Sequence, residues 1–127
     1  MEDCVDPFTP YNADCLLELL YLGVSPTYSK RGIGITLCKV SIEIATLLFN
    51  GQNVKTSLDG KALRLEPRPQ IVTAIFTGLE SKRIGRRLNF DILKTISYEN
   101  LYYNGRSYAS FIGKENTYCT LECKNLQ

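Results

Sequence analysis

The chain contains no histidine, and this absence excludes several kinds of active site. Histidine is the commonest general base near neutral pH, and Ser–His and Cys–His catalytic pairs both require it. A zinc site would have to be built from thiolates and carboxylates at irregular spacings, so we expect no bound metal. Any catalysis by this chain has to use other groups.

Long apolar runs are also missing, since no run approaches the roughly 18 residues that a membrane span needs. Residues 1–14 form a polar leader without a basic region or an apolar core, so we expect no signal peptide and a cytoplasmic location. The net charge of the whole chain is only +2. Without a wider basic surface, we expect neither a nucleic-acid partner nor a membrane partner.

The cysteine count is odd, which argues against a disulfide framework. The five cysteines are Cys4, Cys15, Cys38, Cys119 and Cys123. Because no secretory signal accompanies them, we expect free thiols. Cys119 and Cys123 are four residues apart in a strand-like segment, and this spacing places them on the same face.

The first half of the chain predicts a strand followed by a helix within a single domain. The apolar run from Cys15 to Val24 is short and ends near Gly23, which favours a strand. After a loop, a helical repeat begins at Gly34 and ends at Asn50-Gly51. Its predicted apolar face consists of Leu37, Val40, Ile44 and Leu48.

The second half predicts more strands and a short helix. Residues 52–70 carry turn signals and two prolines, and we expect an exposed excursion with short strands. Strands are expected over 71–78, 90–98 and 117–126, with a tyrosine-rich loop before the last one. Ser81 is expected to cap a short helix that ends at Leu88. The order of these elements predicts a mixed α/β protein.

Glycines at the start of the first helix indicate an anion site. The segment "RGIG" (Arg31 to Gly34) follows a strand and a loop, and helix N-termini present free N–H groups to anions. A Walker loop would need Gly-Lys-Ser/Thr, which is missing. A dinucleotide fingerprint would need a small residue where Leu37 stands. The simpler interpretation is that Gly32 and Gly34 only make a tight turn.

The segment "YLGVSPTYSKRGIGITL" resembles the cofactor motif of the GNAT superfamily of acyl-CoA N-acyltransferases. The remainder, from "IVTAIFTGLESKRIGRR" to the end, is similar to the C-terminal half of insect arylalkylamine N-acetyltransferase-like proteins. The resemblance covers residues 15–127. It implies a three-layer fold with a mixed sheet flanked by helices, truncated at its N-terminus. Ser29 and Asn89 depart from the family pattern, which usually has Arg or Gln and Gly there.

The resemblance also implies a set of residues that bind acetyl-CoA. The pyrophosphate loop would comprise Lys30, Arg31, Gly32, Ile33, Gly34, Ile35 and Thr36. Leu22, Gly23 and Val24 would pair with the pantetheine arm through their backbone. The amide of Val24, with Gly23 as the alternative, would polarise the thioester carbonyl. Arg83 would approach the phosphates at the adenosine end.

For catalysis, the resemblance points to the hydroxyls of Thr77 and Ser81, which could protonate the leaving thiolate. An ordinary strand end at Thr77 and a helix cap at Ser81 are the structural alternatives. The implied reaction is direct acetyl transfer to a primary arylalkylamine, whose identity the sequence leaves open. Neither Glu2 nor Asp6 matches the family's general base. The alternative is therefore an inactive CoA-binding remnant or an incomplete gene product, with self-association through the exposed edge of a truncated sheet.

Overall fold

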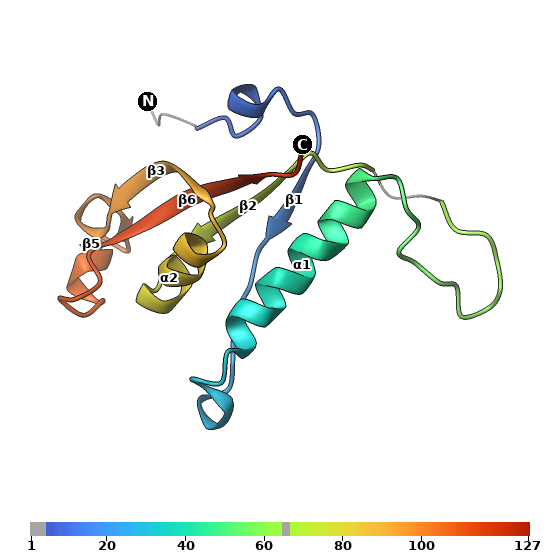
Figure 1. The fold of residues 1–127 in the computed structure, drawn as a ribbon. Helices are drawn as coiled ribbons and strands as arrows, with labels where there is room; N and C mark the ends of the chain where they lie inside the picture. The colour runs from blue at the N-terminus through green and yellow to red at the C-terminus, as the bar shows by residue number, and fades with distance from the viewer. Residues whose placement is uncertain (1–4, 65–66) are drawn as a thin grey trace.

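The computed structural model describes residues 5–64 and 67–127, and its centre is a four-stranded mixed sheet (Figure 1). The strands are β1 (Leu16–Leu19), β2 (Ile71–Phe76), β3 (Asp91–Ser97) and β6 (Tyr118–Asn125). Their order across the sheet is β1-β2-β6-β3. β1 runs parallel to β2, whereas β6 is antiparallel to both of its neighbours. A small separate hairpin joins β4 (Tyr102–Tyr103) to β5 (Arg106–Ser107).

Two α-helices pack against the same face of this sheet, and the expected mixed α/β class is confirmed. They are α1 (Ile33–Phe49) and α2 (Leu79–Arg87). Ala45 of α1 belongs to the buried core with Val72, Ala74 and Phe76 of β2. On α2, Gly85 lies close to the Phe76 ring, so this helix covers the same side. Short 3-10 turns occur at η1 (Thr9–Tyr11), η2 (Pro26–Tyr28), η3 (Tyr98–Asn100) and η4 (Tyr108–Ser110).

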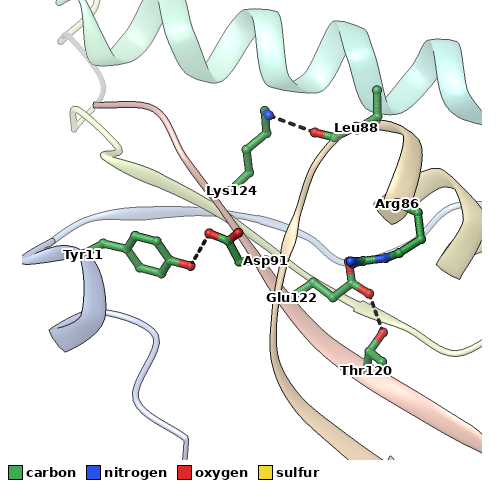
Figure 2. A network of polar contacts seen from close by, with 7 residues as sticks. All are labelled: Tyr11, Arg86, Leu88, Asp91, Thr120, Glu122 and Lys124. Carbon is green, nitrogen blue, oxygen red and sulfur yellow. Dashed lines mark hydrogen bonds and ion pairs between the residues drawn. The ribbon is translucent and has the colours of Figure 1, made fainter.

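The N-terminal segment contacts the opposite face of the sheet. The hydroxyl of Tyr11 donates to Asp91 Oδ2 at 2.8 Å (Figure 2). Gln127 Nε2 donates to the Tyr11 carbonyl at 3.0 Å. Cys123 is fully buried beside Tyr11, and burial raises the pKa of its thiol to about 11. The four cysteines in the described part are free thiols, as expected, while Cys4 and Glu2 lie outside that part.

The predicted apolar face of α1 is largely wrong. Leu37, Val40 and Ile44 are 47%, 45% and 41% exposed, and of the predicted set only Leu48 is buried. The helix instead turns Cys38, Ile42 and Ala45 toward the core. The helix is apolar on most of its circumference, so hydrophobic periodicity alone could not tell the core face from the outer one.

Other boundaries also differ from those expected. α2 begins at Leu79, so Ser81 is its third residue and Gly78 is the N-cap. In the described part of the 52–70 excursion there are no strands. Asn89, at the usual glycine position, has a φ of 56°, the left-handed conformation that asparagine tolerates. No helix in the described part of the chain combines the length and apolar character needed to cross a membrane.

Candidate functional site

The pairing of the two parallel strands stops where β1 ends, while β2 continues for two more residues. β1 pairs with β2 only from Leu16↔Ile71 to Leu19↔Ala74. Beyond that point β2 continues to Phe76, but residues 20–24 are not part of the described sheet. The expected strand over 15–24 is therefore too long at its C-terminal end. We call the region between residues 20–24 and 75–77 the strand divergence, because the parallel pairing of β1 with β2 has ended there.

The loop after residue 24 changes direction through two left-handed residues. Ser29 Oγ donates to the Pro26 carbonyl at 2.9 Å and closes the η2 turn. Lys30 then has a φ of 60° and Gly32 a φ of 74°. The Arg31 guanidinium lies 5.5 Å from the centre of the Tyr28 ring. Both basic side chains, on Lys30 and Arg31, are exposed beside the start of α1.

The N-terminus of α1 is open. Its N-cap is Gly32, which offers no side-chain acceptor, and the first turn contains no acidic residue. The earliest helical bond runs from the Thr36 amide to the Gly32 carbonyl at 3.1 Å, and the Thr36 hydroxyl donates to the same oxygen at 2.8 Å. The amides of Ile33, Gly34 and Ile35 precede that bond and point along the positive end of the helix dipole.

Gly34 brings the open helix end up to the strand divergence. A Cβ built on Gly34 would lie 3.4 Å from Cδ1 of Ile84 on α2, 3.9 Å from Val24 Cγ2 and 4.0 Å from Leu22 Cδ2. α1, the segment after β1 and α2 therefore meet at Gly34, at distances that a Cβ would make as ordinary van der Waals contacts. Leu22, Val24 and the loop amides, which the sequence assigned to one cofactor, are brought together. Gly23 has open space around its α-carbon.

Thr77 and Ser81 lie at the end of β2, on the other side of the divergence. The Thr77 carbonyl accepts from Tyr98 Oη at 2.5 Å and from Asn116 Nδ2 at 2.8 Å, while the residue itself is exposed. The Ser81 hydroxyl accepts from the Gly78 amide and donates to the Gly78 carbonyl, both at 3.0 Å. The Ser81 hydroxyl therefore satisfies the N-cap amide of α2, one of the N–H groups at that helix end.

The basic residues of α2 do not gather at the site. Arg83 pairs with Glu80 of the same helix, and both side chains are exposed. Arg86 forms an ion pair with Glu122, which is fully buried on β6 and also accepts from Thr120 Oγ1 at 2.7 Å (Figure 2). Arg86 therefore contacts β6, whereas Arg83, which the resemblance assigns to the adenosine-end phosphates, lies on the exposed side of α2.

The Lys82 side chain also contacts the sheet and the loop before β6. Its ammonium group donates to Asn116 Oδ1 and to the Tyr118 carbonyl, both at 2.7 Å, and lies 3.8 Å from the centre of the Tyr118 ring. Burial lowers the pKa of Lys82. Sequence reasoning missed these inward cations. The sequence feature that could have revealed them is the polar alternation of Thr120, Glu122 and Lys124 along β6. Such alternation normally indicates a solvated face, but this face of β6 lies against α2 and its C-terminal turn.

In the part of the chain that the structure describes, no group of three or more cysteine, aspartate or glutamate side chains is placed to hold a metal ion.

No protein-family model matches this sequence, and no curated protein matches it. Solved structures do match. Arylalkylamine N-acetyltransferase 2 from Aedes aegypti is 19% identical with a TM-score of 0.68, and the match covers 97% of this chain and 48% of that one.

Two further structures extend the comparison. The polyamine N-acetyltransferase of Drosophila melanogaster, which forms N-acetylagmatine, is 17% identical with a TM-score of 0.65, covering 94% of this chain and 48% of that one. Arabidopsis thaliana NAA60 in complex with acetyl-CoA is 20% identical with a TM-score of 0.50, covering 87% and 48%. The chain spans about half the length of each of the three solved structures.

These matches define the fold as that of the GNAT acyltransferases. Within that fold, the insect arylalkylamine N-acetyltransferases are among the structures that this chain resembles, in agreement with the motifs of its sequence. At 14–21% identity the likeness concerns the fold.

Proposed function

We propose that the chain takes part in acetyl-CoA-dependent N-acetyl transfer to a primary amine. The observation that carries this proposal is the strand divergence, which lies directly beside an uncapped helix N-terminus without acidic residues. A diphosphate is an anion that fits such an end, because N–H donors and the helix dipole both favour negative charge. NAA60, which shares the fold, was solved with acetyl-CoA bound, and acetyl-CoA is therefore the proposed co-substrate here.

The co-substrate would lie along the divergence with its diphosphate at α1. The amides from Arg31 to Thr36 would bind the diphosphate oxygens, and Lys30 and Arg31 would add positive charge. The backbone of residues 22–24 lacks a strand partner, so the amide and carbonyl groups of the pantetheine arm could pair with it. Arg83, which is exposed and held only by a surface ion pair with Glu80, could turn to a phosphate at the adenosine end.

The chemical step joins the amine nitrogen to the acetyl carbon and breaks the carbon–sulfur bond. The amine loses one proton, and the CoA thiolate takes one up. The Val24 amide, or that of Gly23, would donate to the carbonyl oxygen as negative charge develops there. Thr77 and Ser81 are the proposed proton donors to the thiolate. Ser81 would first have to release the Gly78 carbonyl, so the exposed hydroxyl of Thr77 is the more accessible of the two.

An arylalkylamine is the proposed acceptor, by analogy with the Aedes aegypti enzyme. Direct transfer within a ternary complex is the mechanism that fits, since no cysteine or histidine nucleophile is assigned to the site. A CoA-binding protein without activity is the second candidate. It is favoured by the engagement of the Ser81 hydroxyl in the α2 cap and by the lack of an assigned general base.

Thermal unfolding with and without acetyl-CoA tests binding, and release of free thiol on adding tryptamine or spermidine tests turnover. Ligand at 100 times its Kd should stabilise the fold by about 2.7 kcal/mol. Stabilisation with thiol release supports the transferase, and stabilisation without release supports the second candidate. A cooperative unfolding transition that acetyl-CoA leaves unchanged would contradict both.

A further inference from the structure

Two side chains converge on one backbone oxygen just beyond the end of β2. The Thr77 carbonyl accepts from Tyr98 Oη at 2.5 Å and from Asn116 Nδ2 at 2.8 Å. The pairing of β2 with β6 ends at Phe76↔Thr120, so this carbonyl lies outside the ladder and takes its partners from side chains. A carbonyl oxygen has two lone pairs, and both are used here. We call Tyr98 and Asn116 the carbonyl clamp.

The two members of the carbonyl clamp stand at opposite ends of one loop. Tyr98 follows β3 directly, and Asn116 lies two residues before β6. The Tyr98 amide also donates to the Thr117 carbonyl at 2.9 Å, which joins the two ends of the loop. The base of the loop over 98–117 is therefore fastened to the end of β2, and the position of Thr77 is tied to β3 and β6 as well as to its own strand.

Lys82 fixes the orientation of the Asn116 amide. Its ammonium group donates to Asn116 Oδ1 at 2.7 Å, and because an ammonium group can only donate, Oδ1 faces Lys82 and Nδ2 faces Thr77. Lys82 is 8% exposed and also donates to the Tyr118 carbonyl at 2.7 Å, while Tyr98 is 3% exposed. Breaking hydrogen bonds of buried groups is costly, so this network holds the Thr77 backbone in one place.

We propose that Tyr98 and Asn116 are positioning residues for the Thr77 hydroxyl in acetyl transfer. This assignment rests on the proposed function, in which that hydroxyl donates a proton to the CoA thiolate and regains one that the amine releases. A proton donor has to stay within hydrogen-bond reach of its acceptor, and a displacement of about 1 Å can cost about a hundredfold in rate. The carbonyl clamp uses the carbonyl of Thr77 and not its hydroxyl, so it fixes the residue without competing for the proton.

Steady-state kinetics of the full chain with acetyl-CoA and tryptamine or spermidine test the carbonyl clamp. Tyr98→Phe keeps the ring and removes one donor, so kcat should fall about tenfold while KM for acetyl-CoA stays within about twofold. Asn116→Asp keeps an acceptor for Lys82 but turns an oxygen toward the Thr77 carbonyl, and should lower kcat at least as much. Tyr108→Phe is the matched control, because Tyr108 lies in the same loop and its hydroxyl forms no hydrogen bond with the residues that the structure describes. It should leave kcat unchanged.

A double-mutant cycle separates positioning from a merely structural role. Thr77→Val removes the hydroxyl but keeps the carbonyl, and should lower kcat at least about tenfold. In that background, Tyr98→Phe should change kcat by less than about twofold, because the hydroxyl that it positions is gone. Circular dichroism should show all variants folded.

The outcomes distinguish this assignment from the proposed function. If the wild type turns over and Tyr98→Phe lowers kcat as much in the Thr77→Val background as in the wild type, the assignment is overturned and the transferase stands. Tyr98→Phe and Asn116→Asp variants that turn over like the wild type would have the same meaning. A wild type that releases no thiol would overturn the proposed transfer, and the assignment with it.

Discussion

The two helices each follow a strand of the parallel pair and each has a glycine at its N-cap, yet their first turns differ. α2 begins three residues after Phe76 and carries Glu80 in its first turn, and the Ser81 hydroxyl accepts from the Gly78 amide. α1 follows β1 after a longer loop and has no acid in its first turn and no side-chain hydrogen bond at its N-cap. The positive end of the α1 dipole is therefore not offset by a carboxylate of its own first turn.

The two helices also differ in how they meet the sheet. α2 is short and basic, and Lys82 and Arg86 reach polar partners on β6 and in the loop before it. α1 is long and apolar, and contacts the core without ion pairs to the sheet among the described residues. Polar contacts fix α2 in one place, whereas burial of apolar surface holds α1.

Breaking the buried ion pair of α2 should have the largest effect. Arg86→Ala leaves the Glu122 carboxylate buried without its cation, and removing one member of such a pair costs about 3 kcal/mol. Arg83→Ala is the matched control, because its pair with Glu80 is exposed, and should cost less than about 0.5 kcal/mol. Urea denaturation measures both. Equal losses would show that Glu122 is not stabilised by Arg86.

Replacing a glycine by alanine should destabilise the protein more on α2 than on α1. A Cβ on Gly85 would lie 2.4 Å from Glu122 Oε2 and 2.8 Å from the Phe76 ring, so Gly85→Ala should cost about 2 kcal/mol through overpacking. A Cβ on Gly34 meets nothing closer than 3.4 Å, so Gly34→Ala should change stability by less than about 1 kcal/mol. Urea titration measures the unfolding free energies of both variants. A larger loss for Gly34→Ala than for Gly85→Ala would contradict this account.

A negative charge at the open end of α1 should stabilise the free protein slightly. Ile33→Glu imitates the acidic first turn of α2 and should raise the unfolding free energy by about 0.5 kcal/mol relative to the uncharged Ile33→Gln. The difference should disappear in about 1 M salt, where the Debye length is about 3 Å. No difference at low salt would indicate that the α1 end is not electropositive.

The smallest expected effect concerns the inward lysine of α2. Burial lowers the pKa of Lys82 below its usual 10.5, so the unfolded chain binds this proton more tightly than the folded chain. Stability should therefore rise with pH toward 10.5 in the wild type relative to Lys82→Met. Urea titrations of both proteins between pH 8 and pH 10.5 measure this difference. A difference that falls over that range would contradict the burial of Lys82.

Local signals in the sequence predicted the order of the elements and several of their ends. Asn50-Gly51 ends α1, where Asn50 is the C-cap and Gly51 has a φ of 76°, and Asn89 adopts a left-handed conformation at the usual glycine position. These features depend on neighbouring residues alone. The anion site at the start of α1 stays a prediction from the glycines and from the resemblance to the GNAT motif. The structure brings Gly34, Leu22 and Val24 of that motif together.

Features that depend on distant pairing could not be predicted. The core face of α1 was missed because leucines and isoleucines occupy both of its sides, and only the position of β2 decides which side is buried. The alternation along β6 does not show that Glu122 is buried, because its burial depends on Gly85, which lets α2 approach this strand closely. The early separation of β1 from β2 likewise depends on register, which propensity does not encode.

The central claim is that the open end of α1 binds the diphosphate of acetyl-CoA. Calorimetric titration of acetyl-CoA into the wild type, Ile33→Glu and Thr46→Glu tests it most directly, since Thr46 lies far along the same helix. The account predicts binding to the wild type and to Thr46→Glu, and binding at least tenfold weaker to Ile33→Glu. A folded wild type that gives no binding heat or thermal shift, or equal affinity for all three proteins, would contradict it.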